Sequence, residues 1–163
     1  GVLDELGEME WMQIAIKPSK PFAFGTVTRG ARKVPVFGLP GNPVSSFVSF
    51  EVLARPALRQ MMGANDCEPR FIPAIADAPF TRGMGDDKQH LVRAVASFGD
   101  DGRVHVTTTG AQGSHQLASS ASANALVVID DGEVVAAGDD VRTLVLDWLP
   151  TEIDPSRRVR DDS

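Results

Sequence analysis

The chain has 163 residues, of which 42% are hydrophobic and 23% are charged, so it can bury the core of an ordinary domain and is not a disordered tail. Its net charge of −6 argues against a general nucleic-acid binder, and no apolar run approaches the roughly 18 residues that a membrane span needs. The single cysteine, Cys67, excludes an intramolecular disulfide framework and indicates a reducing compartment. We therefore expect a cytoplasmic protein.

Short apolar runs followed by one helix are predicted in the first 68 residues. Asn42 is the expected N-cap of a helix over 44–62, Pro43 suits its first position, and Pro56 predicts a kink or a break near Arg55. The helix is apolar on most sides, which indicates burial. The nearly continuous apolar character of the preceding runs is typical of strands in a parallel sheet, and these strands are expected at 11–16, 22–27 and 34–37.

The later sequence changes character. Residues 1–70 carry a net charge of +1, whereas residues 71–163 carry −7. Turn signals rich in Gly and Asp separate short strand-like runs, which is typical of a small all-β barrel or sandwich. A short helix is expected at 114–124, and the strands at 71–76, 91–98, 104–109, 125–129 and 142–148.

These patterns predict an α/β domain followed by a small β domain. The expected divisions are 1–68 for the α/β part, 69–150 for the β domain and 151–163 for a flexible tail.

The turn Gly38-Leu39-Pro40-Gly41-Asn42-Pro43-Val44-Ser45-Ser46 is the first candidate site. It leads from a buried strand to a helix N-terminus, where unpaired N–H groups and the helix dipole favour an anion. Gly41, Asn42, Pro43 and Ser45 are therefore candidate binding residues. The alternative is an ordinary strand-to-helix turn with a good cap.

The segment Lys17-Pro18-Ser19-Lys20-Pro21 is the second candidate. Its prolines hold the chain extended, so that Lys17 and Lys20 could present two ammonium groups to a phosphate or oxyanion. The alternative is a pair of solvated surface lysines. In the β domain, Arg93 lies in a strand and Ser114 follows a Gly-flanked turn, and simple exposure or a plain turn is the alternative for each.

The sequence resembles the C-terminal region of the MoeA family, the molybdopterin molybdenumtransferases, to which the E domain of gephyrin is related. The motifs that carry the resemblance are KPSKPFAFG, VPVFGLPGNPVSSFVSFEVLARPALRQMMG, LVRAV and DDGRVHVTTTGAQGSHQLASSASANALVVI. It extends from about Val2 to Trp148, and GLPGNPVSS is its most specific part.

The resemblance implies an activity and a fold. Family members insert molybdate into adenylylated molybdopterin with Mg²⁺, which yields molybdenum cofactor and AMP, and they act as cytoplasmic homodimers. The first half of this chain would be the later part of a MogA-like domain, and other proteins of the cofactor pathway are further expected partners. The resemblance also implies that Lys17 and Lys20 are catalytic and that Gly41, Asn42, Pro43, Ser45, Arg93 and Ser114 bind the pterin substrate, Arg93 and Ser114 across the subunit interface.

Two departures from the family accompany the resemblance. Family members are longer, and their Gly-Gly-x-Ser-x-Gly-x-x-Asp stretch, which should help to bind Mg²⁺, would precede this chain. The metal ligands are therefore unknown. We expect the chain by itself to be an inactive fragment. Ser19 stands where the family usually has Gly, and it would be strained if that position needed a positive φ angle. Two alternatives stay open: a gephyrin-like scaffold module that binds peptides by strand addition, and a dimerising domain without activity.

Overall fold

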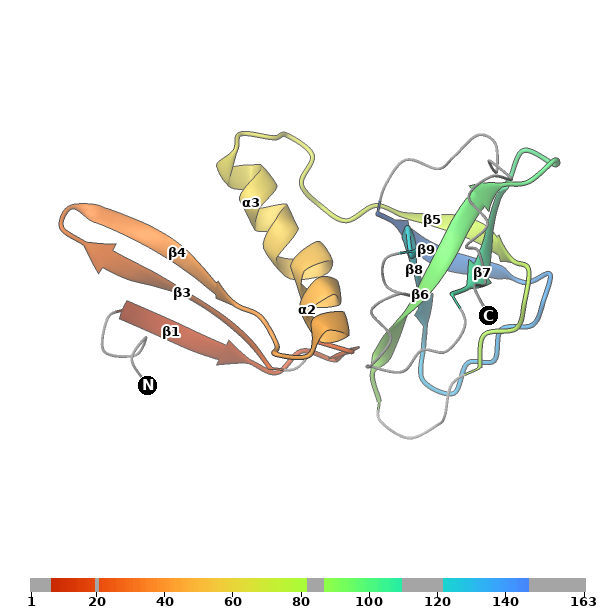
Figure 1. Ribbon diagram of the computed structural model, residues 1–163, viewed down its shortest axis with the longest axis horizontal. Coiled ribbons are helices and arrows are strands. Elements are labelled where there is room, and N and C mark those ends of the chain that lie inside the picture. The colour runs from red at the N-terminus through yellow and green to blue at the C-terminus, as the bar shows by residue number, and fades with distance from the viewer. Residues whose placement is uncertain (1–6, 20, 82–86, 110–121, 147–163) are drawn as a thin grey trace, which may run out of the picture.

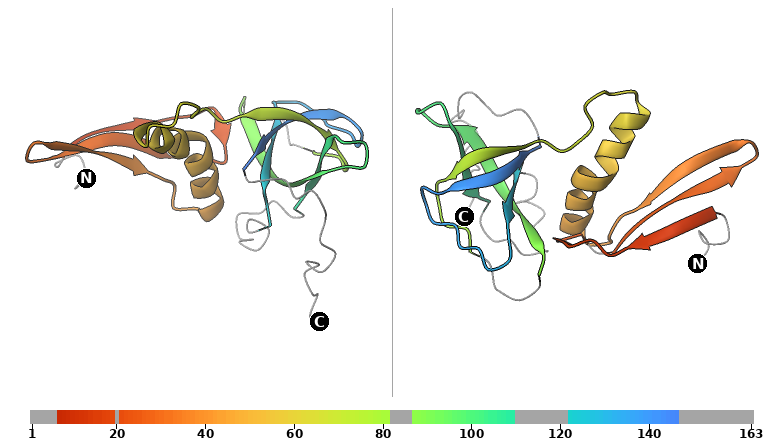
Figure 2. Two further views of the ribbon diagram at one scale, coloured as in Figure 1. Left: turned by 90° about the horizontal axis from the view of Figure 1, so that it is seen from above. Right: turned by 180° about the vertical axis from the view of Figure 1, so that it is seen from behind.

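The computed structural model describes residues 7–19, 21–81, 87–109 and 122–146. Within them, a three-stranded sheet and a six-stranded sheet lie on either side of a helical segment (Figure 1). The same order is visible from above and from behind (Figure 2). The expected α/β part followed by a β-barrel is confirmed, and the short helix predicted at 114–124 and the tail at 151–163 lie largely or wholly outside the described residues.

The first sheet contains β1 (Gly7–Met12), β3 (Phe22–Arg29) and β4 (Arg32–Gly38) in the order β1-β3-β4. Both pairings are antiparallel, so the predicted parallel sheet was wrong for these strands. The reason is the short Gly30-Ala31 turn, in which Gly30 has a φ of 61°, because so short a connection can only join antiparallel strands. The strand predicted at 11–16 is likewise replaced by β1 and a separate short strand.

The helical segment is continuous but irregular. It consists of α2 (Pro43–Ser49), the π-helical turn η1 (Phe50–Ala54) and α3 (Arg55–Met61). The π-helical turn ends two residues before Pro56, which has no N–H to donate. The break considered near Arg55 does not occur, and the irregularity found there is this π-helical turn. The prediction that the whole helix is buried was wrong for α3, none of whose residues is buried.

The second sheet closes into a small barrel. Its strands are β5 (Phe71–Ala76), β6 (Gln89–Phe98), β7 (Val104–Thr108), β8 (Ala125–Ile129) and β9 (Asp140–Val145). They pair in the order β6-β7-β5-β9-β8, and β8 returns to β6 to complete the ring. Small alanine side chains make a narrow interior possible; those in its core are Ala74, Ala76, Ala94, Ala96 and Ala125.

Closure has a consequence for the scaffold alternative. Every described barrel strand has a paired neighbour on both sides over part of its length, but β5 pairs with β7 only through Ile75 and Ala76. Closure therefore reduces the edges open to strand addition without removing them, and the scaffold alternative stays open.

Two sets of contacts hold the barrel against the rest of the chain, in addition to the covalent linker at 62–70 and the hydrogen bond that Arg55 donates to the carbonyl of Leu146. The short strand β2 (Ile16–Lys17) pairs in parallel with the start of β6. The second set of contacts is an apolar core between α2 and the outer face of the barrel, in which Val48 is fully buried. This core contains Val48, Leu91, Leu126, Val128 and Leu144, with Ile16, Phe47, Val52 and Leu146 packed against it. The candidate site residues belong to these same elements.

Candidate functional site

The turn between β4 and α2 is built around Asn42. This residue has the extended conformation of an N-cap, and its Oδ1 atom accepts hydrogen bonds from the backbone nitrogens of Val44 at 3.0 Å and Ser45 at 3.2 Å. Pro43 occupies the first turn, as predicted. The cap therefore engages two of the N–H groups that the sequence analysis assigned to an anion. An anion bound here would have to displace the Asn42 side chain or contact neighbouring groups.

The two glycines of this turn have different surroundings. A Cβ atom added to Gly38 would lie 3.0 Å from the Cβ atom of Ala23, so Gly38 permits close packing of β4 on β3. A Cβ atom added to Gly41 would meet nothing within 4 Å, and Gly41 is exposed. Gly41 thus lies at an open surface, where a ligand could approach the backbone closely.

Lys17 is held by strand pairing. It is the second residue of β2, its partner in the register is His90 of β6, and its side chain is exposed. Ser19 follows as a buried residue whose hydroxyl donates a 2.9 Å hydrogen bond to the carbonyl of Ile16. Ser19 has no positive φ angle, so the strain considered for Ser at this position does not arise. Lys20 lies outside the described residues.

Arg93 is almost completely buried, with 1% of its surface exposed. The simple exposure considered for a strand arginine was therefore wrong. Burial lowers the pKa of the Arg93 guanidinium, which nevertheless stays charged in proteins. A buried cation of this kind costs free energy unless it is compensated, and Arg93 is not without a partner in this structure. Ser114 lies outside the described residues.

The strand alternation separates Lys17 from Arg93. Arg93 and Leu91 are two residues apart on β6, so they lie on the same face of the strand. Leu91 belongs to the outer core that packs against α2. Lys17 is in register with His90, which lies opposite the inward-facing Ile129 on β8. The structure thus brings the Lys17 strand and the Arg93 strand together in one sheet, with α2 packed on its outer face, but points the two side chains to opposite faces.

Ser49 is a residue that the sequence analysis missed. It lies on α2 one turn after Ser45, is fully buried, and its Oγ atom has no hydrogen-bond partner among the described residues. Buried hydroxyls are normally paired, because an unpaired one forfeits the hydrogen bonds it made with water. The signal in the sequence was the i, i+4 spacing of the two serines, which places them on the same face of the helix.

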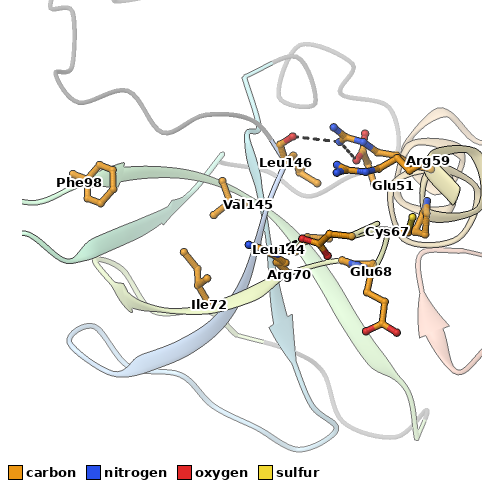
Figure 3. Close-up of a pocket in the computed structure, with 14 residues that line it drawn as sticks. Glu51, Arg59, Cys67, Glu68, Arg70, Ile72, Phe98, Leu144, Val145 and Leu146 are labelled. Carbon is orange, nitrogen blue, oxygen red and sulfur yellow. Dashed lines mark hydrogen bonds and ion pairs between the residues drawn. The ribbon is translucent and has the colours of Figure 1, made fainter. Parts of the chain in front are cut away.

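The structure also contains a cavity of about 550 Å³ between the helical segment, the linker after it and the barrel (Figure 3). None of the predicted site residues lines it. Arg55 is held there by Glu51 at 2.6 Å, and Arg70 by Asp66, so most of the charge in the cavity is paired internally. The apolar floor includes Ile72 and Leu144. The cavity joins residues of the helical segment to barrel residues that are far from them in sequence, so the sequence analysis did not predict it.

A magnesium site does not fit the described residues. They contain no group of three or more His, Cys, Asp or Glu side chains that could hold a metal ion. Mg²⁺ prefers several oxygen ligands, often from carboxylates, so we assign no step of the chemistry to a metal on the described part of the chain. In the same part of the chain, no helix is long and apolar enough to cross a membrane.

Two sequence families match the chain in succession. Residues 2–60 match the probable molybdopterin binding domain, and residues 70–146 match the MoeA C-terminal region, domain IV. A molybdopterin molybdenumtransferase of Haemophilus influenzae is 32% identical over 142 residues, which cover 86% of this chain and 34% of the relative. Molybdopterin molybdenumtransferase 1 of Mycobacterium tuberculosis is 38% identical over 144 residues, covering 86% and 33%.

Solved structures agree with these matches. The molybdopterin biosynthesis moeA protein of Pyrococcus horikoshii superposes with a TM-score of 0.68 at 26% identity, covering 90% of this chain and 34% of that protein. The chain thus spans about a third of the length of the relatives it matches. The chain belongs to the MoeA family, and its second half corresponds to domain IV of that family.

Proposed function

We propose that this chain takes part in molybdenum cofactor biosynthesis as a portion of a molybdopterin molybdenumtransferase. The reaction would insert molybdate into adenylylated molybdopterin and release molybdenum cofactor and AMP. The observation that carries the proposal is the succession of the two family matches over residues 2–60 and 70–146, in the same order as in relatives that bear this name.

Lys17 and Lys20 would bind the anionic parts of the substrates. An ammonium group is a compact charge that suits phosphate and tetrahedral oxyanions. Pairing of β2 with β6 supports this role for Lys17, because it fixes an exposed lysine on a strand rather than on a free loop. A fixed cation loses less conformational entropy when it binds its ligand.

The turn at the start of α2 would form a second wall of the site. Gly41 leaves open space, Asn42 and Pro43 fix the turn, and Ser45 adds a hydroxyl whose oxygen lies 3.5 Å from Asn42 Oδ1. Arg93 would act from within the interface between barrel and helix, where a buried guanidinium contributes positive potential at low dielectric. Ser114 would supply a further hydroxyl from the barrel.

The remaining parts of the proposal concern assembly and location. The divisions 1–68, 69–150 and 151–163 would be the α/β domain, the β domain and a tail. The active form would be a homodimer that works in the cytoplasm with other proteins of the cofactor pathway. Mg²⁺ would be required, with ligands other than the described residues.

The test is molybdate-dependent AMP release from adenylylated molybdopterin. It should be measured on the chain alone and on a chimaera in which the chain replaces its matched region of the 38% identical M. tuberculosis relative. We expect turnover by the chimaera and none by the chain alone. Lys17→Ala and Lys20→Ala should each abolish AMP release, whereas Arg59→Ala, which removes an exposed cation from α3, should not. An inactive but folded chimaera, or normal turnover by both lysine variants, would contradict the proposal.

A further inference from the structure

The cavity between the helical segment and the barrel has the dimensions of a ligand site. Its volume of about 550 Å³ lies in the range of cavities that take small organic molecules, roughly 300–1,000 Å³. Residues of η1 and α3 line one side, residues of β5 and β9 line the other, and linker residues 66–70 complete the wall (Figure 3). None of the residues assigned to the molybdate and pterin substrates lines it. A ligand bound here would therefore occupy a site separate from that of the proposed reaction.

The barrel side of the cavity is apolar. It consists of Ile72 on β5, Phe98 at the end of β6, and Leu144, Val145 and Leu146 at the end of β9. Phe98 is 46% exposed although it is a large aromatic side chain. A flat apolar molecule on this wall would remove part of that surface from water, and an aromatic ring can also pack against the ring of Phe98.

Two of the three arginines in the cavity already have anionic partners. Arg55 donates a hydrogen bond to Glu51 at 2.6 Å and another to the carbonyl oxygen of Leu146 at 3.3 Å. Arg70 forms an ion pair with Asp66. These contacts tie the helical segment to the barrel and fix one end of the linker. They also leave neither arginine in need of a further anion.

Arg59 is the cation of the lining that remains available. It lies one turn after Arg55 on α3, is exposed, and its guanidinium has no hydrogen-bond or ion-pair partner in the part of the chain that the structure describes. Glu68 likewise has no partner there, but Figure 3 shows its carboxylate directed away from the helical segment. The cavity thus combines one free positive charge with an apolar wall.

We propose that this cavity binds an aromatic monoanion, a flat apolar ring system that carries one carboxylate or sulfonate group. The rings would lie on the apolar wall near Phe98, and the anionic group would bind the guanidinium of Arg59, whose planar set of N–H donors matches such a group. A bare inorganic anion would gain nothing from the apolar wall. A neutral aromatic compound would leave Arg59 without a partner. Because the ligand would contact the helical segment, the linker and the barrel, its binding would stabilise the folded arrangement of all three.

The test compares two probes that share their rings and differ in charge. One is 8-anilinonaphthalene-1-sulfonate, and the other is N-phenyl-1-naphthylamine, which lacks the sulfonate. Each is titrated by fluorescence into the full chain. Arg59→Gln should raise the dissociation constant of the sulfonate about fivefold and leave that of the neutral compound unchanged. The matched control is Arg32→Gln, which removes an exposed cation of β4 that does not line the cavity, and it should change neither constant.

A second variant and a chemical reporter locate the probe. Phe98→Ala should weaken the binding of both compounds, because it removes part of the apolar wall that they share. Cys67 is the single cysteine of the chain and lies in the cavity lining. Bound sulfonate should therefore slow alkylation of its thiol by iodoacetamide, a neutral reagent that does not compete for Arg59. Circular dichroism verifies that each variant folds.

The proposal has clear failure outcomes. Equal weakening of sulfonate binding by Arg59→Gln and Arg32→Gln would show general attraction to positive charge, and unprotected Cys67 would place the probe elsewhere. Probe binding that requires removal of residues 147–163 would mean that this segment of the chain is the occupant. Any of these results would overturn the proposal. None bears on AMP release by the chimaera, since the residues proposed to bind its substrates lie outside this cavity.

Discussion

The imidazole of His105 and the carboxylate of Asp77 bind each other where the end of β5 lies beside the start of β7, with Nδ1 of His105 2.6 Å from Oδ1 of Asp77. The other ring nitrogen lies 3.2 Å from Oδ1 of Asp101, in the turn between β6 and β7. The hydrogen bond with Asp77, followed by that with Asp101, raises the pKa of His105 above its ordinary value of 6.5. The charged ring thus links the β5 end of the barrel to the β6–β7 turn.

The first prediction concerns the pH dependence of stability. The pKa of His105 is higher in the folded chain than in the unfolded chain. The stabilisation that the charged imidazole gives the fold is therefore fully present below pH 6.5 and is lost as the pH rises through the folded-state pKa. The free energy of unfolding of the unmodified chain should therefore exceed that of His105→Gln at acidic pH, and the difference should shrink above neutrality. Urea unfolding across pH 6 to 9 measures it. A difference that does not change over this range would refute the assignment.

In acid, the pH dependence of stability that comes from Asp101 has the opposite direction to that from His105. The pKa of Asp101 is lowered, mainly by the hydrogen bond that it accepts from the backbone nitrogen of Arg103 at 2.9 Å and also by His105. The stabilisation that the charged Asp101 carboxylate gives the fold is present above its ordinary pKa of 3.8. It disappears as the pH falls through the lower folded-state pKa. Asp101→Asn should therefore reduce the free energy of unfolding at neutral pH and flatten the loss of stability in acid.

The second prediction concerns Ser49, whose buried hydroxyl has no partner. Removing an unpaired buried hydroxyl should stabilise the chain, and Ser49→Ala is expected to raise the free energy of unfolding by about 1 kcal/mol. Ser45→Ala is the matched control on the same helix, since its hydroxyl is close to Asn42 Oδ1 and no gain is expected. Destabilisation by Ser49→Ala would mean that the hydroxyl makes an interaction absent from this structure.

The third prediction separates the structural role of Asn42 from its proposed binding role. Asn42→Ala removes the cap of α2 and should cost about 1 kcal/mol of stability. Asn42→Asp keeps an oxygen that can cap the helix, so its stability should match that of the unmodified chain. Its negative charge should nevertheless weaken the binding of molybdate or phosphate at the proposed site. Thermal unfolding and molybdate titration measure the two effects, and unchanged molybdate affinity in Asn42→Asp would remove Asn42 from the anion site.

Local chemistry in the sequence was sufficient to predict some of these features. Asn42 and Pro43 specify a helix start through short-range hydrogen bonding and a fixed φ angle, and Pro56 specifies an irregularity, so these predictions needed no tertiary information. Apolar character alone does not encode strand direction. The antiparallel hairpin is set by its short turn at Gly30, a signal that the sequence analysis did not use.

Other features depend on contacts between distant parts of the chain. Burial of Arg93 results from its position on the face of β6 that carries Leu91 and packs against α2, and alternation within a strand does not specify which face is covered. Pairing of Lys17 with His90 joins residues far apart in the sequence through a strand of only two residues, too short to have a periodic pattern. The cavity lined by Arg55 and Arg70 likewise exists only where the linker crosses the barrel.

The fourth prediction tests the close approach of β1 and β3. A Cβ atom added to Gly25 would lie 2.1 Å from the carbonyl oxygen of Glu8 and 2.9 Å from the Cα atom of Met9, both of which belong to the backbone of β1. Because a backbone cannot move aside as a side chain can, Gly25→Ala should displace β1 and destabilise the chain by about 1–3 kcal/mol.

Gly41→Ala is the control for this substitution. Gly41 has open space around it and no positive φ angle, so alanine there should be neutral or stabilising by up to about 1 kcal/mol through the unfolded state. Urea unfolding compares the two variants, and hydrogen exchange of the β1 amides shows whether the loss is local to this strand. Equal stability of Gly25→Ala and Gly41→Ala would mean that β1 does not lie against β3 at this distance, and the register Met9 to Gly25 would have to be revised.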